Sequence, residues 1–346
     1  MGINDVRRLF GVLALLTISM ACSSSGQAPA AATVASTPTA APQHVNVMWV
    51  AKVANMAPAW VALDAGYYRE QGLDVDLTYA NGSPVGMAAL LSGQIDVLEA
   101  AGTAVVTAAA GTQDAVKKPV QFIGTVNDAV FKLMVNSSIG TLDELRGKTL
   151  CISKAGSADE IALKLYLQRN HMDPARDVNI VTSGSLEGCA ASLQAQQSAG
   201  SMLSTPFTAL LQDAGFKPLV DFAKEKIKLQ QLGVATTAGY AQTHPDVLLR
   251  FTRAYIQGIH RFKTDKAFAE DAMRKYLDVS DQRQLDDAFE TYRDVFEQVP
   301  LPSAEAFQSV IDTVPQATGM SPSSVMEPRF VQQLEQDGFI KSVYGS

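Results

Sequence analysis

Segments with strand-like and helix-like residue patterns alternate along most of this chain, and the alternation limits the folds that it can adopt. Residues 44–54 (HVNVMWVAKVA) alternate in polarity and are rich in β-branched and aromatic side chains, which is typical of a buried strand. Residues 57–72 then carry apolar side chains at helical spacing and end at Gly72. Strand and helix patterns continue to alternate through residues 73–136. This order predicts an open, mostly parallel α/β sheet.

A second copy of the alternation begins at Leu142. We expect a short helix and a strand at residues 142–153, a helix at 158–170, a strand at 178–183 and a helix at 186–197. The copy continues with a strand at 201–204, a helix at 207–215 and a strand at 226–237, and from His244 onward the pattern is mainly amphipathic helix.

The two copies predict two α/β lobes, the second inserted into the first. Lobe I is expected to contain residues 43–127 and 228–346, with a helical C-terminal part, and lobe II residues 128–227. The chain would therefore cross between the lobes twice.

The first residues have the pattern of a secretory signal peptide, expected at residues 1–21. Arg7 and Arg8 precede an apolar stretch from Leu9 to Ala21 that is too short to span a bilayer permanently. Cys22 then stands at the first mature position, where bacterial lipoproteins carry their lipid anchor. The alternative is cleavage by ordinary signal peptidase, which would leave Cys22 as a free exported thiol. Either way the chain is expected to be exported to the periplasm or cell surface, with lipid on Cys22 as its membrane anchor in the first case.

Composition excludes some classes of partner and leaves one covalent question open. Residues 22–42 are rich in Ser, Ala, Pro, Thr and Gly, which predicts a flexible tether. A net charge of −7 without a basic tract argues against nucleic acid as a partner. Cys151 and Cys189 are the two other cysteines; in an oxidising compartment they form either a disulfide or two small buried thiols.

Four segments resemble a known family when they are taken as an ordered set. They are APAWVALDAGYYREQGLDVDL (57–77), ALLSGQIDV (89–97), LDELRGKTLCIS (142–153) and GYAQTHPDVLLRFTRAYIQGI (239–259). They look like the substrate-binding proteins of ABC importers, in the branch with NMT1/THI5-like, aliphatic-sulfonate, taurine and nitrate binders. The resemblance covers about residues 44–315 and implies a two-lobed periplasmic-binding-protein type II fold. It also implies a small-molecule ligand, permease and ATPase subunits as partners, and a monomer.

Ligands of open α/β sheets bind beyond the carboxyl ends of the strands, and this rule selects the candidate site residues. The loop at Gly156 and Ser157 opens a helix, so its backbone N–H groups are expected to face a polar ligand atom, unless Ser157 is only a helix cap. Tyr79 and Phe207 stand near strand ends, where they could stack on a ligand. The full set of expected ligand-binding residues is Lys52, Asn55, Tyr79, Asn81, Ser83, Glu99, Thr103, Asn127, Gly156, Ser157, Ser185, Thr205 and Phe207.

Glu99 is the unusual residue in this set, because it follows the apolar stretch IDVL. A carboxylate that faced the cleft would repel an anion and accept hydrogen bonds from an amino group or a ring N–H. The alternative is a solvated loop charge or a pair with Lys52. With the two aromatic candidates, Glu99 predicts a heteroaromatic or amine-bearing ligand such as a thiamine-type pyrimidine. The alternative within the same family is a sulfonate, taurine or nitrate.

Catalytic motifs are missing from the sequence. The four histidines are scattered, and there is no H-x-x-x-H pair, no G-x-S-x-G elbow and no P-loop. We therefore expect a binding protein that needs no cofactor and no metal, rather than a secreted enzyme. A ligand-binding component of a sensor is the remaining alternative, and the sequence does not separate it from an importer component.

Overall fold

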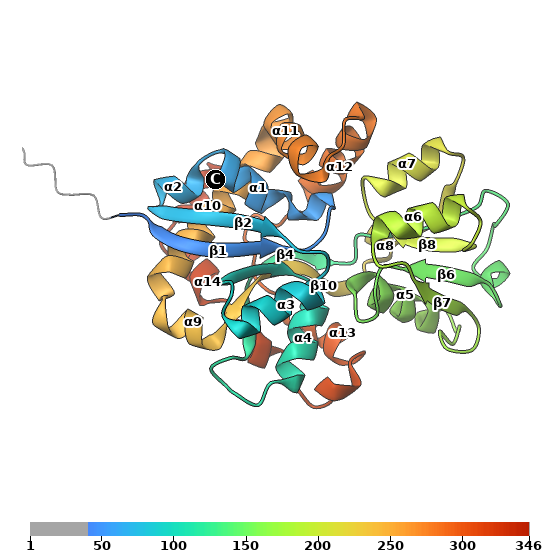
Figure 1. The fold of residues 1–346 in the computed structure, drawn as a ribbon, viewed down its shortest axis with the longest axis horizontal. Coiled ribbons are helices and arrows are strands. Elements are labelled where there is room, and N and C mark those ends of the chain that lie inside the picture. The colour runs from blue at the N-terminus through green and yellow to red at the C-terminus, as the bar shows by residue number, and fades with distance from the viewer. Residues whose placement is uncertain (1–40, 346) are drawn as a thin grey trace, which may run out of the picture. The chain divides into compact units, whose positions relative to one another are not determined.

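Two five-stranded sheets organise the protein (Figure 1). The computed structural model describes residues 41–345, so the expected signal peptide and Cys22 lie outside the described residues. The first sheet has the order β2-β1-β3-β10-β4, with β1 at Gln43–Trp49, β2 at Leu73–Tyr79, β3 at Val97–Ala100, β4 at Pro119–Asp128 and β10 at Lys228–Thr237. The second has the order β7-β6-β8-β5-β9, with β5 at Lys132–Val135, β6 at Thr149–Ile152, β7 at Asn179–Thr182, β8 at Gly200–Leu203 and β9 at Lys217–Asp221.

Helices α1 to α8 lie between strands along the chain, and α9 to α15 follow the last strand, β10. The α-helices are α1 Ala57–Asp64, α2 Tyr67–Glu70, α3 Ser83–Ser92, α4 Gly102–Gly111, α5 Ala158–Arg169, α6 Leu186–Gln194, α7 Phe207–Asp213, α8 Phe222–Glu225, α9 Ala238–Thr243, α10 Pro245–Thr264, α11 Lys266–Leu277, α12 Gln282–Val295, α13 Ala304–Ile311, α14 Arg329–Gln336 and α15 Phe339–Tyr344. Short 3-10 helices are η1 Ala54–Met56, η2 Asp143–Leu145, η3 Pro315–Ala317 and η4 Pro322–Val325.

The expected two-lobed α/β fold with a helical C-terminal part is confirmed, but the sheets are mixed rather than mostly parallel. In the first sheet β10 runs antiparallel to β3 and β4, and in the second β5 runs antiparallel to β8 and β9. The physical reason is the double crossing. The chain passes from β4 of the first sheet to β5 of the second, and it returns through β10, which pairs beside β4 in the opposite direction. The exact lobe boundaries stay a prediction.

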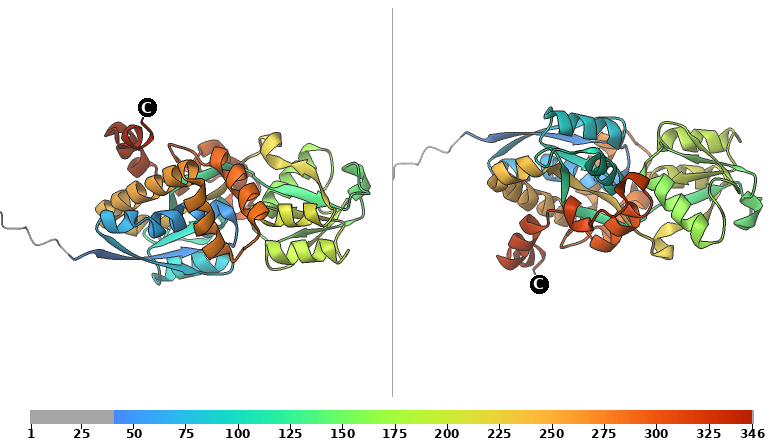
Figure 2. Two further views of the ribbon diagram at one scale, coloured as in Figure 1. Left: turned by 90° about the horizontal axis from the view of Figure 1, so that it is seen from above. Right: turned by 90° about the horizontal axis from the view of Figure 1, so that it is seen from below.

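Helices cover both faces of the first sheet. Helices α1, α2 and α10 lie on one side of it and α3, α4 and α13 on the other (Figure 1). Near the C-terminal end of the chain, α14 and α15 pack against α10 (Figure 2). Helix α10 crosses α1 closely, because a Cβ atom on Gly258 would lie 2.4 Å from the backbone oxygen of Pro58. Only a glycine allows this crossing without a shift of one helix.

Two details of the predicted elements were wrong. The single helix expected at 57–72 is two helices, because Gly66 adopts the left-handed conformation (φ 79°) between α1 and α2. Strand β9 was missed, since Pro218 argues against a central strand. Strand β9 is instead an edge strand, where a proline without an N–H group is tolerated.

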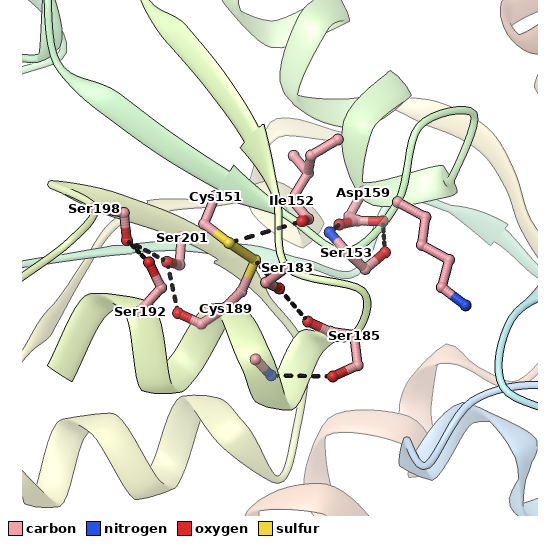
Figure 3. Close-up of a disulfide and its surroundings, with 12 residues drawn as sticks. Cys151, Ile152, Ser153, Asp159, Ser183, Ser185, Cys189, Ser192, Ser198 and Ser201 are labelled. Atoms are coloured by element: carbon pink, nitrogen blue, oxygen red, sulfur yellow. Dashed lines mark hydrogen bonds between the residues drawn. A yellow bond between two sulfur atoms is a disulfide. The ribbon is translucent and has the colours of Figure 1, made fainter. Parts of the chain in front are cut away.

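A disulfide joins β6 to α6 within the second sheet's core (Figure 3). Cys151 and Cys189 are both fully buried, and their Cα atoms are 5.5 Å apart. Ser201 of β8 donates a hydrogen bond from Oγ to the backbone oxygen of Cys189 at 2.9 Å. The crosslink therefore fixes the start of α6, whose first turn follows Ser185, against two strands.

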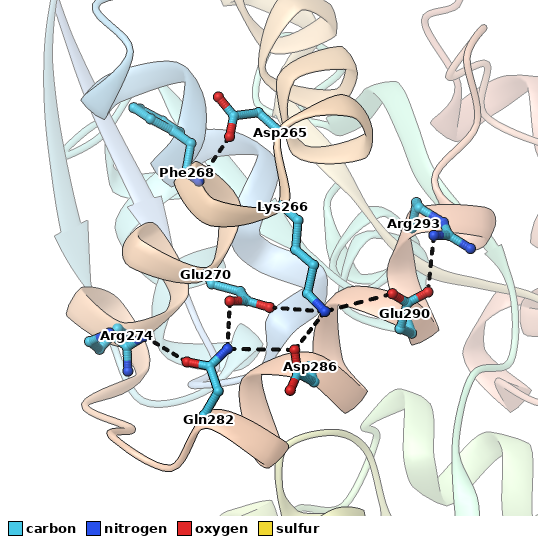
Figure 4. Close-up of polar contacts among 9 residues, drawn as sticks. All are labelled: Asp265, Lys266, Phe268, Glu270, Arg274, Gln282, Asp286, Glu290 and Arg293. Carbon is cyan, nitrogen blue, oxygen red and sulfur yellow. Dashed lines mark hydrogen bonds and ion pairs between the residues drawn. The ribbon is translucent and has the colours of Figure 1, made fainter.

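Helices α11 and α12 are joined by a polar cluster around Lys266 (Figure 4). Lys266 Nζ lies 2.6 Å from Asp286 Oδ1 and 3.5 Å from Glu270 Oε1. Gln282 donates from Nε2 to Glu270 Oε2 at 2.6 Å. Helix α12 also reaches the second sheet, because the hydroxyl oxygens of Tyr292 and Ser204 are 3.0 Å apart in a buried hydrogen bond.

Glu99 lies inside the core of the first sheet. Its side chain is fully buried in β3, and Tyr255 of α10 donates from Oη to Glu99 Oε1 at 2.8 Å. Because that donation uses the only proton of Tyr255, Thr125 must donate to Tyr255 Oη, which is 3.0 Å away. Burial raises the pKa of Glu99 to about 8, against a lowering by the Tyr255 hydrogen bond. Glu99 is therefore a neutral acid at neutral pH.

We expect the double substitution Cys151→Ala/Cys189→Ala to lower the free energy of unfolding by about 2 to 4 kcal/mol. The crosslink closes a loop between residues that are 38 apart, so its removal enlarges the unfolded ensemble. Urea denaturation under oxidising conditions measures the change. Cys22→Ala is the matched control and should leave the unfolding midpoint unchanged, whereas an equal midpoint for all three proteins would contradict the structural role of the bond.

We expect Glu99 to make the wild type less stable as the pH rises from about 4.5 to 8. The unfolded chain loses the Glu99 proton near pH 4.5 and the folded chain only near pH 8, so stability present at low pH is lost across this window. The contribution of this one group is about 1.4 kcal/mol per pH unit. Urea denaturation of wild type and Glu99→Gln at pH 5, 6, 7 and 8 isolates it, because the amide cannot ionise. Parallel stability curves for the two proteins would show that Glu99 ionises normally.

Candidate functional site

A cavity of about 270 Å³ lies between loops of the two sheets. Its walls are the segment after β1, the turn between β2 and α3, the turn between β6 and α5, the start of α6 after β7, and the start of α7 after β8. These loops all follow the carboxyl ends of strands that pair in parallel, or of the neighbouring β8. The geometry therefore agrees with the general rule for ligand sites in open α/β sheets.

The second sheet's side of the cavity contributes a carboxylate that is hydrogen-bonded through both of its oxygens. Asp159 of α5 accepts hydrogen bonds from Ser153, from the backbone N–H at 2.6 Å and from the hydroxyl at 2.8 Å (Figure 3). Burial raises the pKa of Asp159, and the hydrogen bonds from Ser153 lower it. These contacts hold the turn between β6 and α5 in place. Each oxygen of Asp159 is therefore engaged by one protein donor.

The loop at Gly156 and Ser157 lines the cavity, but its N–H groups do not face a ligand. Gly156 donates from its backbone N–H to Glu160 Oε2 at 2.6 Å, and Ser157 donates from its N–H to the Lys154 oxygen at 3.2 Å. The Ser157 hydroxyl also donates to the Lys154 oxygen, at 2.6 Å, and so it does not cap the helix. The expectation of free N–H groups here was wrong, because the carboxylate four residues along the chain takes the available donor. Ser185, in contrast, caps α6 by accepting from Gly188 N–H at 3.0 Å.

Charged residues of both signs line the cavity. Lys154 of the second sheet donates from Nζ to the backbone oxygen of Asn81 in the first sheet at 2.6 Å. This bond connects the two walls directly. Lys52 and Glu187 are exposed lining residues on opposite walls. With Asp159, the formal charges of the lining residues balance, so the cavity does not favour one sign of ligand charge through its net charge alone.

Two aromatic rings line the cavity from opposite walls. Tyr79 ends β2, is 42% exposed, and its ring centroid lies 4.5 Å from that of Trp49. Phe207 begins α7 and is half-buried against the hydrophobic cluster around the disulfide. Both rings are therefore held by packing on one side and open toward the cavity on the other.

Two buried side-chain amides also line the cavity. Gln231 of β10 is 3% exposed and accepts a hydrogen bond through Oε1 from the Val130 backbone N–H. Gln231 Nε2 has no partner among the described residues, and neither does Oδ1 of Asn55, which is 5% exposed in η1. Sequence reasoning missed Gln231. The signal was present as two glutamines inside the apolar strand 229–235 (LQQLGVA), where a buried amide needs a partner.

The structure brings most of the expected site residues to one cavity. The expected residues that line it are Lys52, Asn55, Tyr79, Asn81, Ser83, Gly156, Ser157, Ser185 and Phe207. The expected residues outside the lining are Glu99, Thr103, Asn127 and Thr205.

The four residues outside the lining have structural surroundings of their own. Glu99 is bonded to Tyr255 in the core and pairs neither with Lys52 nor with solvent, so both sequence interpretations of it were wrong. Asn127 donates from Nδ2 to the Leu301 backbone oxygen at 3.0 Å. Thr103 and Thr205 are buried, and their hydroxyl oxygens have no partner among the described residues.

The described part of the chain contains neither a metal-binding cluster nor a membrane-spanning helix. Within residues 41–345 no three His, Cys, Asp or Glu side chains gather closely enough to hold a metal ion. The helices of the same residues include none with the length and apolar content that a membrane crossing requires.

Comparison with known proteins supplies the family. The family model described as NMT1/THI5 like matches residues 53–265. A Bacillus subtilis (strain 168) protein named "Putative binding protein YtlA" is 24% identical over 242 residues, which are 68% of this chain and 72% of that protein.

Solved structures similar to this chain include two periplasmic binding proteins. The aliphatic sulphonate binding protein SsuA from Escherichia coli is 14% identical, with 86% of this chain and 94% of SsuA covered and a TM-score of 0.64. The nitrate-binding protein NrtA from Synechocystis PCC 6803 is 11% identical, with 86% and 89% covered and a TM-score of 0.68. At these identities the structures show a shared fold. The NMT1/THI5-like family model matches more than half of the residues of this chain, and the chain therefore belongs to that family.

Proposed function

We propose that this chain is the extracytoplasmic solute-binding component of an ABC importer, which captures a small organic solute in the cavity between the two sheets. The observation that carries the proposal is the cavity itself, whose walls are strand-end loops of both sheets. Within residues 41–345 the chain passes between the sheets at two places, β4 to β5 and β9 to β10, so the walls can move relative to one another by a hinge motion. A ligand that contacts both walls stabilises the closed arrangement. Family membership and the fold support this function, and permease and ATPase subunits would be the partners.

The ligand that we propose is a small flat heteroaromatic solute, such as a thiamine-type pyrimidine. Tyr79 and Phe207 line opposite walls and offer ring faces for stacking. The cavity volume of about 270 Å³ is below the range of pockets for drug-sized ligands, which begins near 300 Å³. Glu99 does not contribute to this argument, because it lies outside the cavity lining.

A sulfonate, taurine or nitrate is the second candidate ligand. Lys52 and Lys154 both line the cavity, and an ammonium group favours an oxyanion. Against this candidate, Lys154 already donates to the Asn81 oxygen, and Glu187 and Asp159 add two carboxylates to the same walls.

We expect a thermal-shift and calorimetry panel to detect binding of an aminopyrimidine, and Phe207→Ala to weaken it by about 1 kcal/mol through loss of stacking. The panel contains a thiamine-type aminopyrimidine, cytosine, ethanesulfonate, taurine and nitrate. Phe339→Ala is the matched control, since it removes a half-buried ring from α15, which lies outside the cavity lining.

The outcomes of this panel separate the alternatives. Binding of only the sulfonate, taurine or nitrate would replace the proposed ligand with the second candidate. A panel without any binding event would contradict the solute-binding function itself.

We also propose that the protein is anchored to the membrane by lipid on Cys22, which lies outside the described residues. Cys22→Ala should then move the protein from the membrane fraction to the soluble fraction of the producing cells, because the variant cannot carry the lipid. Cell fractionation with immunoblotting measures the distribution. A wild type found wholly in the soluble fraction would count against the lipid anchor.

A further inference from the structure

Helices α7 and α12 pack against one another beside the cavity, and they belong to different sheets. Helix α12 lies against α10, α11 and η1, which accompany the first sheet, whereas α7 lies against α6, β5 and β9 of the second (Figure 1). Phe207, the first residue of α7, lines the cavity. The α7–α12 contact is therefore a place away from the crossing strands where the two halves of the protein touch.

Two hydrogen bonds join α12 to the segment that contains Ser204 and α7. The hydroxyl oxygens of Tyr292 and Ser204 are 3.0 Å apart, and both residues are buried. Thr208 of α7 is also buried and donates from Oγ1 to Asp287 Oδ2 at 3.5 Å. Because Ser204 lines the cavity, a hinge motion that separated the walls here would break these bonds and expose their groups.

Arg283 supplies the opposite charge at this contact. It forms an ion pair with Asp213 of α7 and donates from Nη2 to the backbone oxygen of Ala209 at 3.4 Å. The other charged residues of residues 41–345 that line the groove between the two helices are carboxylates of α12, namely Asp286, Asp287 and Glu290. Without Arg283, carboxylates of both helices would line this groove, and their like charges would repel.

A second contact between the walls is made by Lys154. Its Nζ donates to the backbone oxygen of Asn81 at 2.6 Å. The next residue, Gly82, has a φ of 103°, and a Cβ atom there would lie 2.5 Å from Lys154 Nζ. A glycine therefore leaves the space that the Lys154 side chain occupies when it reaches the opposite wall. Like the α7–α12 contact, this one is made by protein groups alone.

We infer that the α7–α12 contact sets the balance between open and closed arrangements: the Arg283–Asp213 ion pair and the Tyr292–Ser204 bond hold the cavity walls together before a solute binds. Apparent affinity is proportional to the fraction of molecules already in the binding-competent arrangement, so these bonds strengthen solute binding without touching the solute. Arg283 and Asp213 are positioning residues, since both lie outside the cavity lining. The inference rests on the hinge motion of the proposed function, but it does not depend on which solute binds.

Charge reversal tests the inference on the protein without added solute. An exposed ion pair stabilises only weakly, so the variant adds repulsion instead of merely removing attraction. Arg283→Asp places a carboxylate opposite Asp213, and small-angle X-ray scattering should give a larger radius of gyration than for wild type. The double variant Arg283→Asp/Asp213→Arg restores an ion pair of inverted polarity and should return the radius toward that of wild type, a rescue that loss of α12 structure would not show.

Arg293→Gln is the matched control. Arg293 lies on the same helix, but its ion pairs are with Glu290 and Asp294 of α12 itself. This variant should scatter like wild type. Circular dichroism establishes that each variant is folded, and if Arg283→Asp does not fold, Tyr292→Phe decides the matter, because it removes only the hydroxyl that bonds Ser204 and should also enlarge the radius.

A solute from the panel above gives a second measurement. Calorimetry should show that Arg283→Asp binds it at least threefold more weakly than wild type and that the double variant recovers the affinity. An equal or smaller radius of gyration for Arg283→Asp, or an increase that Asp213→Arg does not reverse, would overturn the inference and leave solute binding intact. If wild type binds no solute of the panel, the solute-binding function falls, while the scattering series still decides the inference.

Discussion

The two chain crossings between the sheets are the constraint on which the rest of the structure depends. Because the second sheet is inserted between β4 and β10, both crossing strands must lie side by side in the first sheet, and their antiparallel pairing makes that sheet mixed. Their contacts are the Ala129 to Ile227 bond, the Lys228 and Asp128 ion pair, and the bond of Gln231 to Val130. These bonds tie the two crossing segments to one another, and the loops of the cavity walls begin at strand ends.

Bonds within the protein hold the loops of the cavity walls in place. The disulfide fixes α6 against β6, so the capped start of α6 at Ser185 has a defined position. Asp159 holds the turn after β6 by accepting a hydrogen bond from Ser153. Tyr292 of α12 forms a hydrogen bond with Ser204, which follows β8. A site preorganised in this way loses less conformational entropy when a ligand binds, and so more of the contact free energy appears as affinity.

The sequence predicts every described strand except β9, most of the helices and the cavity loops, because these depend on local periodicity and on the strand-end rule. It misplaces Glu99 for a definite reason. Alternation along a strand tells the two faces apart only where one is solvated, and β3 is buried on both, so all its residues from Val97 to Ala100 look alike. The partner of Glu99 is Tyr255, 156 residues later in the chain, and no local pattern predicts such a contact. The hydrogen bond between Gln231 and Val130 is not predicted for the same reason, because the two residues are 101 positions apart.

Polarity inside the cavity comes from groups with different freedom to bind a ligand. The Asp159 carboxylate and the Lys154 ammonium are both engaged by protein partners, so each would have to give up a charge-assisted bond to contact a solute. The amides of Gln231 and Asn55 each keep one atom without a partner among the described residues, but protein atoms enclose both of these atoms. Lys52 and Glu187 are the exposed charged residues of the lining, so a solute can contact either side chain without breaking a bond that the structure shows.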